Sequence, residues 1–233
     1  MIIGNGQIAN SFLPYKNDSK VLIFASGVSN SQESDSKKFT RERTLLRDSI
    51  NDNKDKIFVY FSTCSVYDLS LKDSKYVKHK IEMENLVVNN SHQFYILRLP
   101  QVVGDPRIKN TNLVCFLFSS ILNNKKIDVY SKSTRNFIDL NNVFLVADFL
   151  IQNKKYINEI TNIASPHNVS IRDIIQMLEE ITSLSLSYDL LDAGYSYEVN
   201  IDKIHSLDID LDIFSSSYLK NILKNYYLRL CAK

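Results

Sequence analysis

Apolar runs of strand length alternate with stretches of helical period along the first half of this chain, and this order is what most limits its possible folds. The apolar runs lie at residues 1–3, 20–25, 56–63 and 93–99, and residues 7–13, 37–50 and 75–89 between them place apolar side chains at helical spacing. Parallel strands need a crossover between them, usually a helix. We therefore expect an α/β fold built on a parallel sheet.

Beyond about residue 105 the pattern is less regular. We expect helices near residues 112–123, 143–152, 170–182 and 216–229, and strands at 127–131 and 160–165. The apolar stripe of 170–182 is more typical of core packing than of a site. We divide the chain into a cofactor-binding part, 1–105, and a part with the remaining sheet elements and a substrate-binding lobe, 106–233, packed as one unit.

Charge and composition exclude several partners. The 28 basic and 26 acidic residues are spread along the chain, which gives no indication of a nucleic-acid or membrane-surface partner. The apolar runs are too short to cross a bilayer, and no export signal is recognisable, so we expect a cytoplasmic protein. Cys64, Cys115 and Cys231 lack the spacing of metal ligands, and we expect no metal site.

Glycine is scarce, and four of the 5 glycines follow an apolar run: Gly4, Gly6, Gly27 and Gly104. The first stretch, GNGQIA, has the form G-x-G-x-x-A between a strand and a helix. Such a turn lets a pyrophosphate approach the backbone, while Ala9 keeps helix and strand close. A plain turn between a strand and a helix gives the same pattern, so the motif alone does not decide.

Tyr76 and Lys80 stand four residues apart in a helical segment and so share one face. Lowering the pKa of a tyrosine from near 10 to about 7 takes roughly 4 kcal/mol. An ammonium at about 4 Å supplies about that much at an effective dielectric near 20. We therefore predict that Lys80 makes Tyr76 a general acid or base at neutral pH. The alternative is a core tyrosine beside a solvated lysine.

Two hydroxyl residues precede this pair. Ser62 and Thr63 end the apolar run 56–63, at the strand edge where ligands of open α/β sheets bind. A hydroxyl there could hold a substrate oxygen while Tyr76 moves its proton. The alternative is a pair of ordinary turn residues.

In their order these motifs resemble the extended short-chain dehydrogenases/reductases that act on nucleotide sugars as epimerases, dehydratases and reductases. The likeness covers nearly the whole chain through GNGQIA, FASG, STCSVY, YVKHK, RLPQVVGDP, RNFIDLNNV and ITNIAS. It implies a Rossmann-like sheet with a small C-terminal substrate-binding lobe. It also implies NAD or NADP as cofactor and a nucleotide-sugar substrate.

The resemblance further implies the site residues. Thr63, Tyr76 and Lys80 would be the catalytic trio. The cofactor would contact Gly4, Gly6, Gln7, Ile8, Ala9, Ala25, Ser26, Gly27, Ser62, Tyr76, Lys80, Pro100, Gln101 and Val102. The substrate would contact Cys64, Ser65, Gln101 and Arg135, the last of which matches the family arginine that binds the phosphates.

The chain departs from the family at one end of the sheet. The family has two more βα units before the strand that ends like FASG, whereas about fifteen residues separate Ala9 from Ala25 here. The acidic residue that would hold the adenosine ribose is missing with them, so NAD and NADP are not distinguished. The first strand becomes a sheet edge, and a homodimer that covers this edge is a hypothesis. Cys64 and Ser65 replace the acidic pair of the dehydratases, which disfavours dehydration.

The sequence thus predicts NAD(P)-dependent reduction or epimerisation of a nucleotide-linked sugar. By resemblance, the setting is bacterial surface-polysaccharide biosynthesis. The rival hypothesis is a catalytically inactive relative that binds a nucleotide sugar or a partner.

Overall fold

Five parallel strands form the central sheet of the computed structural model, which describes residues 1–108 and 112–232. Their order is β1-β2-β3-β4-β9, and they span Ile2–Ile3, Val21–Phe24, Ile57–Thr63, Gln93–Leu99 and Glu159–Asn162. Each neighbouring pair is parallel. The predicted Rossmann-like sheet is confirmed, and so is the position of the first strand at its edge.

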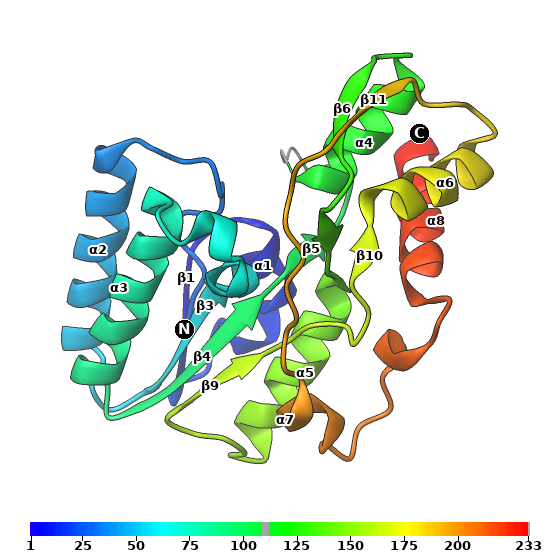
Figure 1. The fold of residues 1–233 in the computed structure, drawn as a ribbon. Coiled ribbons are helices and arrows are strands. Elements are labelled where there is room, and N and C mark those ends of the chain that lie inside the picture. The colour runs from blue at the N-terminus through cyan, green and yellow to red at the C-terminus, as the bar shows by residue number, and fades with distance from the viewer. Residues whose placement is uncertain (109–111, 233) are drawn as a thin grey trace.

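Helices cover both faces of the sheet (Figure 1). Helices α2 (Ser36–Asn51) and α3 (Lys75–Asn90) lie on one face, and α1 (Gln7–Ser11) and α5 (Leu140–Gln152) lie on the other. Side chains of a strand alternate between faces. Leu22 and Phe24 of β2 accordingly pack in the core under α2 and α3, whereas Val21 and Ile23 pack in the opposite core.

Side-chain caps fix where several helices begin. The carboxylate of Asp35 accepts a hydrogen bond from the amide of Lys37 at the start of α2, and Asp139 accepts one from Asn141 at the start of α5. Because of this cap, α5 begins at Leu140, three residues before the predicted start. Asn112 and Ser170 cap α4 (Leu113–Leu122) and α6 (Ile171–Thr182) in the same way, and α8 covers Tyr218–Cys231.

Short strand pairs in the C-terminal part escaped the sequence analysis, apart from the strand near 127–131. They are parallel β5 (Gln101–Val103) with β8 (Phe137–Asp139), parallel β6 (Ile127–Tyr130) with β11 (Tyr188–Leu191), and antiparallel β7 (Thr134–Arg135) with β10 (Val169–Ser170). The remaining elements are α7 (Asp202–His205) and the 3-10 turns Leu13–Tyr15, Cys64–Tyr67, Leu69–Leu71 and Asp212–Phe214. Strands of two to four residues are too short to show a clear alternation of apolar and polar side chains.

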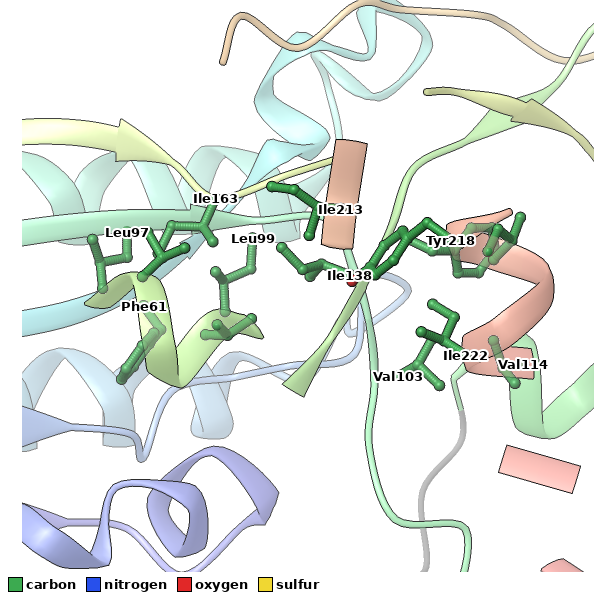
Figure 2. Close-up of a cluster of buried hydrophobic side chains, with 14 of the residues drawn as sticks. Phe61, Leu97, Leu99, Val103, Val114, Ile138, Ile163, Ile213, Tyr218 and Ile222 are labelled. Carbon is green, nitrogen blue, oxygen red and sulfur yellow. The ribbon is translucent and has the colours of Figure 1, made fainter. Parts of the chain in front are cut away.

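The apolar core continues from the sheet into the C-terminal elements. Figure 2 shows Phe61, Leu97 and Leu99 of β3 and β4 in one cluster with Val103 of β5, and with Tyr218 and Ile222 of α8. The division at residues 105 and 106 stays a prediction. Within residues 1–108 and 112–232, no helix is both long and apolar enough to cross a membrane.

Candidate active site

The first turn of the chain lies directly against the end of β2. Gly4 has φ +131°, and a Cβ there would stand 2.4 Å from the carbonyl oxygen of Ala25. Gly6, at φ −79°, precedes α1, and a Cβ on it would meet nothing within 4 Å. Ala9 is buried behind this turn. Gly4 thus permits the close approach to Ala25, whereas Gly6 faces open space.

The side chain of Gln7 joins this turn to the segment after β5. Its Oε1 accepts a hydrogen bond from the amide of Asp105 at 3.0 Å, and its Nε2 donates to the Asp105 carbonyl at 3.3 Å. Gln7 was predicted to contact the cofactor, together with its neighbour Ile8. In this structure its amide group binds the chain itself.

Thr63 and Tyr76 meet at the carboxyl end of β3. The Tyr76 hydroxyl interacts with the Thr63 side chain, and this interaction acts to lower the pKa of Tyr76. Thr63 Oγ1 also accepts a hydrogen bond from the amide of Ser65 at 3.0 Å. Tyr76 is only 6% exposed, and its ring packs with Val28 and Val77. The structure therefore brings together two members of the predicted trio.

Lys80, the third member, points its ammonium elsewhere. Its Nζ donates to the Tyr60 hydroxyl at 2.8 Å, to the Phe61 carbonyl at 3.0 Å and to Glu42 Oε1 at 3.3 Å. Both the Lys80 and the Glu42 side chains are buried, at 3% and 0% exposure. Burial lowers the pKa of Lys80, and the charge of Glu42 acts against this shift.

The prediction that Lys80 brings the pKa of Tyr76 near neutrality is wrong in this structure. Burial raises the pKa of Tyr76 to about 12, and the charge of Glu42 adds to the shift, while the hydrogen bond with Thr63 acts in the opposite direction. The physical reasons are the burial of the phenol and the pairing of Lys80 with Glu42. Tyr76 is consequently a protonated phenol at neutral pH.

The sequence analysis missed Glu42, although a signal was present. Glu42 lies three residues after Phe39 and four before Leu46, on the apolar stripe of the helix that became α2. A carboxylate on such a stripe indicates a buried, paired charge. Although burial alone would raise its pKa, the charge of Lys80 and three further hydrogen bonds bring the pKa of Glu42 down to about 2.

Helix α2 also holds the loop after β2. Arg41 donates to the Ser26 carbonyl at 2.7 Å, and Glu42 accepts from the amide of Val28 at 2.7 Å. A Cβ on Gly27 would stand 2.8 Å from Glu42 Oε1 and 3.0 Å from Lys80 Nζ. Gly27 of the predicted adenosine-side segment therefore lies directly against the Lys80–Glu42 pair.

Ser62 belongs to a second buried charged group. Its hydroxyl donates to Glu84 on α3, and Glu84 also accepts two hydrogen bonds from Arg98 on β4, at 2.9 and 2.6 Å. Neighbouring residues of a strand face opposite sides, so Ser62 and Thr63 diverge. The predicted cofactor contact of Ser62 is not supported by this arrangement, because its hydroxyl is already bound inside the protein.

The segment after Pro100 forms β5, beside β8. The amide of Gln101 donates to the Asn136 carbonyl at 3.1 Å, and Val102 pairs with Ile138. Gln101 and Val102 are half-buried at the carboxyl end of β4. Their predicted contacts with cofactor and substrate stay predictions.

The predicted substrate residues come from both halves of the chain. Cys64 and Ser65 follow β3, whereas Arg135 lies on β7, where its Nη1 donates to the Thr134 carbonyl at 2.8 Å. Cys64 is buried, which raises its pKa. Tyr197 lies within electrostatic range of both Cys64 and Arg135, and burial raises its pKa to about 12.

Tyr197 was missed because it lies in a segment without periodicity. Residues 192–201 run between β11 and α7 along the front of the molecule in Figure 1. Side chains on either side bind this segment: Asn168 donates to the Tyr197 carbonyl, Asn162 to the Asn200 carbonyl at 2.8 Å, and the Thr134 hydroxyl pairs with Ser196 at 2.8 Å. Nothing in the residue types of 192–201 predicts this path.

Solved structures of known proteins match this chain, whereas sequence comparisons do not. No family model and no curated protein sequence matches the chain. UDP-glucuronic acid 4-epimerase from Bacillus cereus, solved with UDP-glucuronic acid and NAD, matches with a TM-score of 0.72 and 23% identity, over 97% of this chain and 79% of the epimerase. A dTDP-4-dehydrorhamnose reductase from Clostridium acetobutylicum matches with a TM-score of 0.71 and 15% identity, over 97% of this chain and 86% of the reductase.

The chain has the fold of the extended short-chain dehydrogenases/reductases. A UDP-N-acetylglucosamine 4-epimerase from Methanobrevibacter ruminantium shares it, with a TM-score of 0.70 and 14% identity, over 91% of this chain and 77% of the epimerase. The resemblance predicted from the sequence is thus confirmed for the fold. Within this short-chain dehydrogenase/reductase fold, the Glu42–Lys80 pair lies beside the tyrosine and threonine of the predicted trio.

Proposed function

We propose that the protein is an NAD(P)-dependent enzyme that reduces a keto group on, or epimerises a carbon of, a nucleotide-linked sugar. The observation that carries the proposal is the meeting of the Thr63 and Tyr76 hydroxyls at the carboxyl end of β3. Ligands of open parallel sheets bind at this edge. A cytoplasmic location and a role in bacterial surface-polysaccharide biosynthesis belong to the same proposal.

The first turn fits a dinucleotide. Gly4 brings the turn against Ala25, and the space beside Gly6 is open, so a phosphate group has room at the backbone. Gly4, Gly6 and Ala9 would hold the pyrophosphate, and residues 25–27 would lie beside the adenosine. When bound, the cofactor supplies or accepts hydride.

Tyr76 exchanges a proton with the reacting oxygen in this proposal. Thr63 holds the same oxygen, because its side chain already interacts with the Tyr76 hydroxyl. Arg135 and Tyr197 would contact the nucleotide sugar from the C-terminal part. A guanidinium is suited to bind phosphate oxygens in pairs.

A substitution at Gly6 tests the cofactor site without disturbing the fold. Aspartate is a good helix cap, and a Cβ at this position meets no atom within 4 Å, so we expect Gly6→Asp to leave the melting temperature unchanged. Its carboxylate would repel a pyrophosphate, and we expect the affinity for NAD or NADP to fall at least about tenfold, measured by titration calorimetry. Gly6→Ser, which supplies a cap without charge, is the matched control, and we expect it to lose less affinity for the dinucleotide than Gly6→Asp.

The same titration separates the proposal from its rival. The Lys80–Glu42 and Gln7–Asp105 contacts occupy groups predicted to meet the cofactor, which favours a relative that binds a nucleotide sugar without turnover. Wild-type protein that binds neither NAD nor NADPH at millimolar concentration would establish this rival. If Gly6→Asp binds the dinucleotide as tightly as wild type, the phosphates do not bind at the first turn.

We also propose a homodimer. In the described residues β1 pairs with β2 alone, which leaves its outer edge without a strand partner. Exposed edges favour pairing with another chain. Light scattering at micromolar concentration should give twice the monomer mass, and a monomer there would contradict this proposal.

A further inference from the structure

Glu42 is a fully buried charge that the reaction proposed above does not use. Its carboxylate accepts hydrogen bonds from the Val28 amide at 2.7 Å, the Tyr60 hydroxyl at 2.7 Å and His79 Nε2 at 2.9 Å, besides its contact with Lys80 at 3.3 Å. A buried carboxylate with a charged partner and several donors is strongly held. The position of Glu42 is therefore fixed by α3, β3 and the loop after β2 together.

The donors of Lys80 are fully used in the described residues. An ammonium has three N–H donors. They meet three acceptors, the Glu42 carboxylate, the Tyr60 hydroxyl and the Phe61 carbonyl. Because Tyr60 gives its own proton to Glu42, its oxygen lone pairs are free to accept from Lys80. No donor of Lys80 is left to stabilise a Tyr76 phenolate.

The other ionisable groups near Tyr76 do not replace that donor. They come from each element packed around it: Glu42 on α2, Tyr60 on β3, Cys64 in the following turn, His79 and Glu84 on α3, and Arg98 on β4. Arg98 is paired with Glu84, and His79 donates from Nε2 to Glu42. The two cations Lys80 and Arg98 are thus each paired with a carboxylate, that of Glu42 and that of Glu84.

We infer that Glu42 is a positioning residue that commits this site to reduction of a carbonyl group: by holding Lys80, it leaves Tyr76 as a phenol that donates its proton. The inference rests on the function proposed above and selects one of its two reactions. The carbonyl oxygen of the sugar takes the Tyr76 proton while its carbon takes hydride from the reduced dinucleotide. The C=O π bond breaks, C–H and O–H bonds form, and the dinucleotide is oxidised. Tyr76 is left as a phenolate and recovers a proton from water.

Epimerisation through a keto intermediate requires the opposite protonation state of Tyr76 at its first step. It begins with removal of a proton from a sugar hydroxyl, for which Tyr76 must already be a phenolate. A phenolate in this pocket would face the Glu42 carboxylate and find no free Lys80 donor. Reduction begins from the protonation state that the structure holds.

Nuclear magnetic resonance of the full chain tests the inference without any substrate. Tyrosine labelled with carbon-13 at Cζ reports ionisation of each ring, and comparison with Tyr76→Phe assigns the Tyr76 signal. In wild type we expect the Tyr76 signal to remain that of a phenol through pH 10, the ordinary pKa of tyrosine. A wild-type signal that titrates at or below pH 10 overturns the inference.

Glu42→Gln then identifies the cause. The amide keeps the shape of the side chain but removes its charge, so we expect the acid dissociation constant of Tyr76 to rise at least about tenfold. Glu82→Gln, which alters the exposed ion pair with Arg43, is the matched control and should titrate as wild type. A folded Glu42→Gln protein with the wild-type titration would also overturn the inference, and the wild-type titration decides it even where Glu42→Gln does not fold. Failure to bind a dinucleotide would refute the proposed function but leave these titrations unchanged, so the two failures are distinguishable.

Discussion

Tyr76→Phe is expected to lower turnover by about 10²–10⁴-fold, the usual contribution of a general acid or base. The substitution removes the hydroxyl that meets Thr63 and leaves the ring that packs with Val28 and Val77. We therefore expect the melting temperature and the affinity for a dinucleotide to stay close to wild type. Steady-state kinetics should show the loss in kcat rather than in KM, because the proton moves only in the transition state.

Tyr130→Phe is the matched control for this experiment. Tyr130 lies on β6 with about half of its surface exposed, and it has no part in the proposed reaction. We expect full activity from it. Full activity in Tyr76→Phe would refute the role of Tyr76 as proton donor. Loss of folding would instead indicate that the Tyr76 hydroxyl is needed for stability.

Arg98→Met is expected to destabilise the protein by about 3–5 kcal/mol, the usual effect of removing one partner of a buried ion pair. Glu84 is 4% exposed and accepts two hydrogen bonds from Arg98. The substitution leaves its carboxylate buried, with the hydrogen bond from the Ser62 hydroxyl still in place. The measurement is urea denaturation, read as a fall in the midpoint at constant slope.

Arg43→Met provides the matched control for the buried pair. Arg43 binds Glu82 through the same bidentate pair of hydrogen bonds, but the two side chains are 44% and 50% exposed. Surface pairs contribute roughly 0–1 kcal/mol, so we expect a loss of less than about 1 kcal/mol. The double variant Arg98→Met with Glu84→Gln should recover part of the lost stability. Equal losses at Arg98 and Arg43 would contradict the assignment of a buried pair.

The fold of the first hundred residues could be predicted because its signals are local. Each strand of the sheet up to β4 is a continuous apolar run, and the crossover helices carry their apolar stripes within a few turns. The short spacing between Ala9 and Ala25 placed β1 at the sheet edge, since one helix can carry the chain to a single neighbouring strand. The short pairs β5–β8, β7–β10 and β6–β11 were mostly missed. Two to four residues are too few to show the alternation of apolar and polar side chains that identifies a strand.

The positions of Thr63, Tyr76 and Lys80 in the fold could be predicted, but the electrostatics around them could not. The spacing of Tyr76 and Lys80 correctly placed them on one helix, and Thr63 correctly at the end of β3. The pKa predicted for Tyr76 was wrong, because it depends on the burial of the phenol and on where the ammonium of Lys80 points. That direction is set by Glu42, 38 residues away along the chain.

The order of apolar runs and glycines in the chain by itself determined a parallel sheet with its first strand at the edge and a hydroxyl pair at the end of β3. Periodicity and chain length act over a few residues, so they can be recognised without coordinates. The tertiary structure alone decided that Glu42 neutralises Lys80, that Glu84 binds Ser62 and Arg98, and that residues 192–201 bring Tyr197 near Cys64 and Arg135. Charges interact through space, and their partners are chosen by which helices and strands pack together.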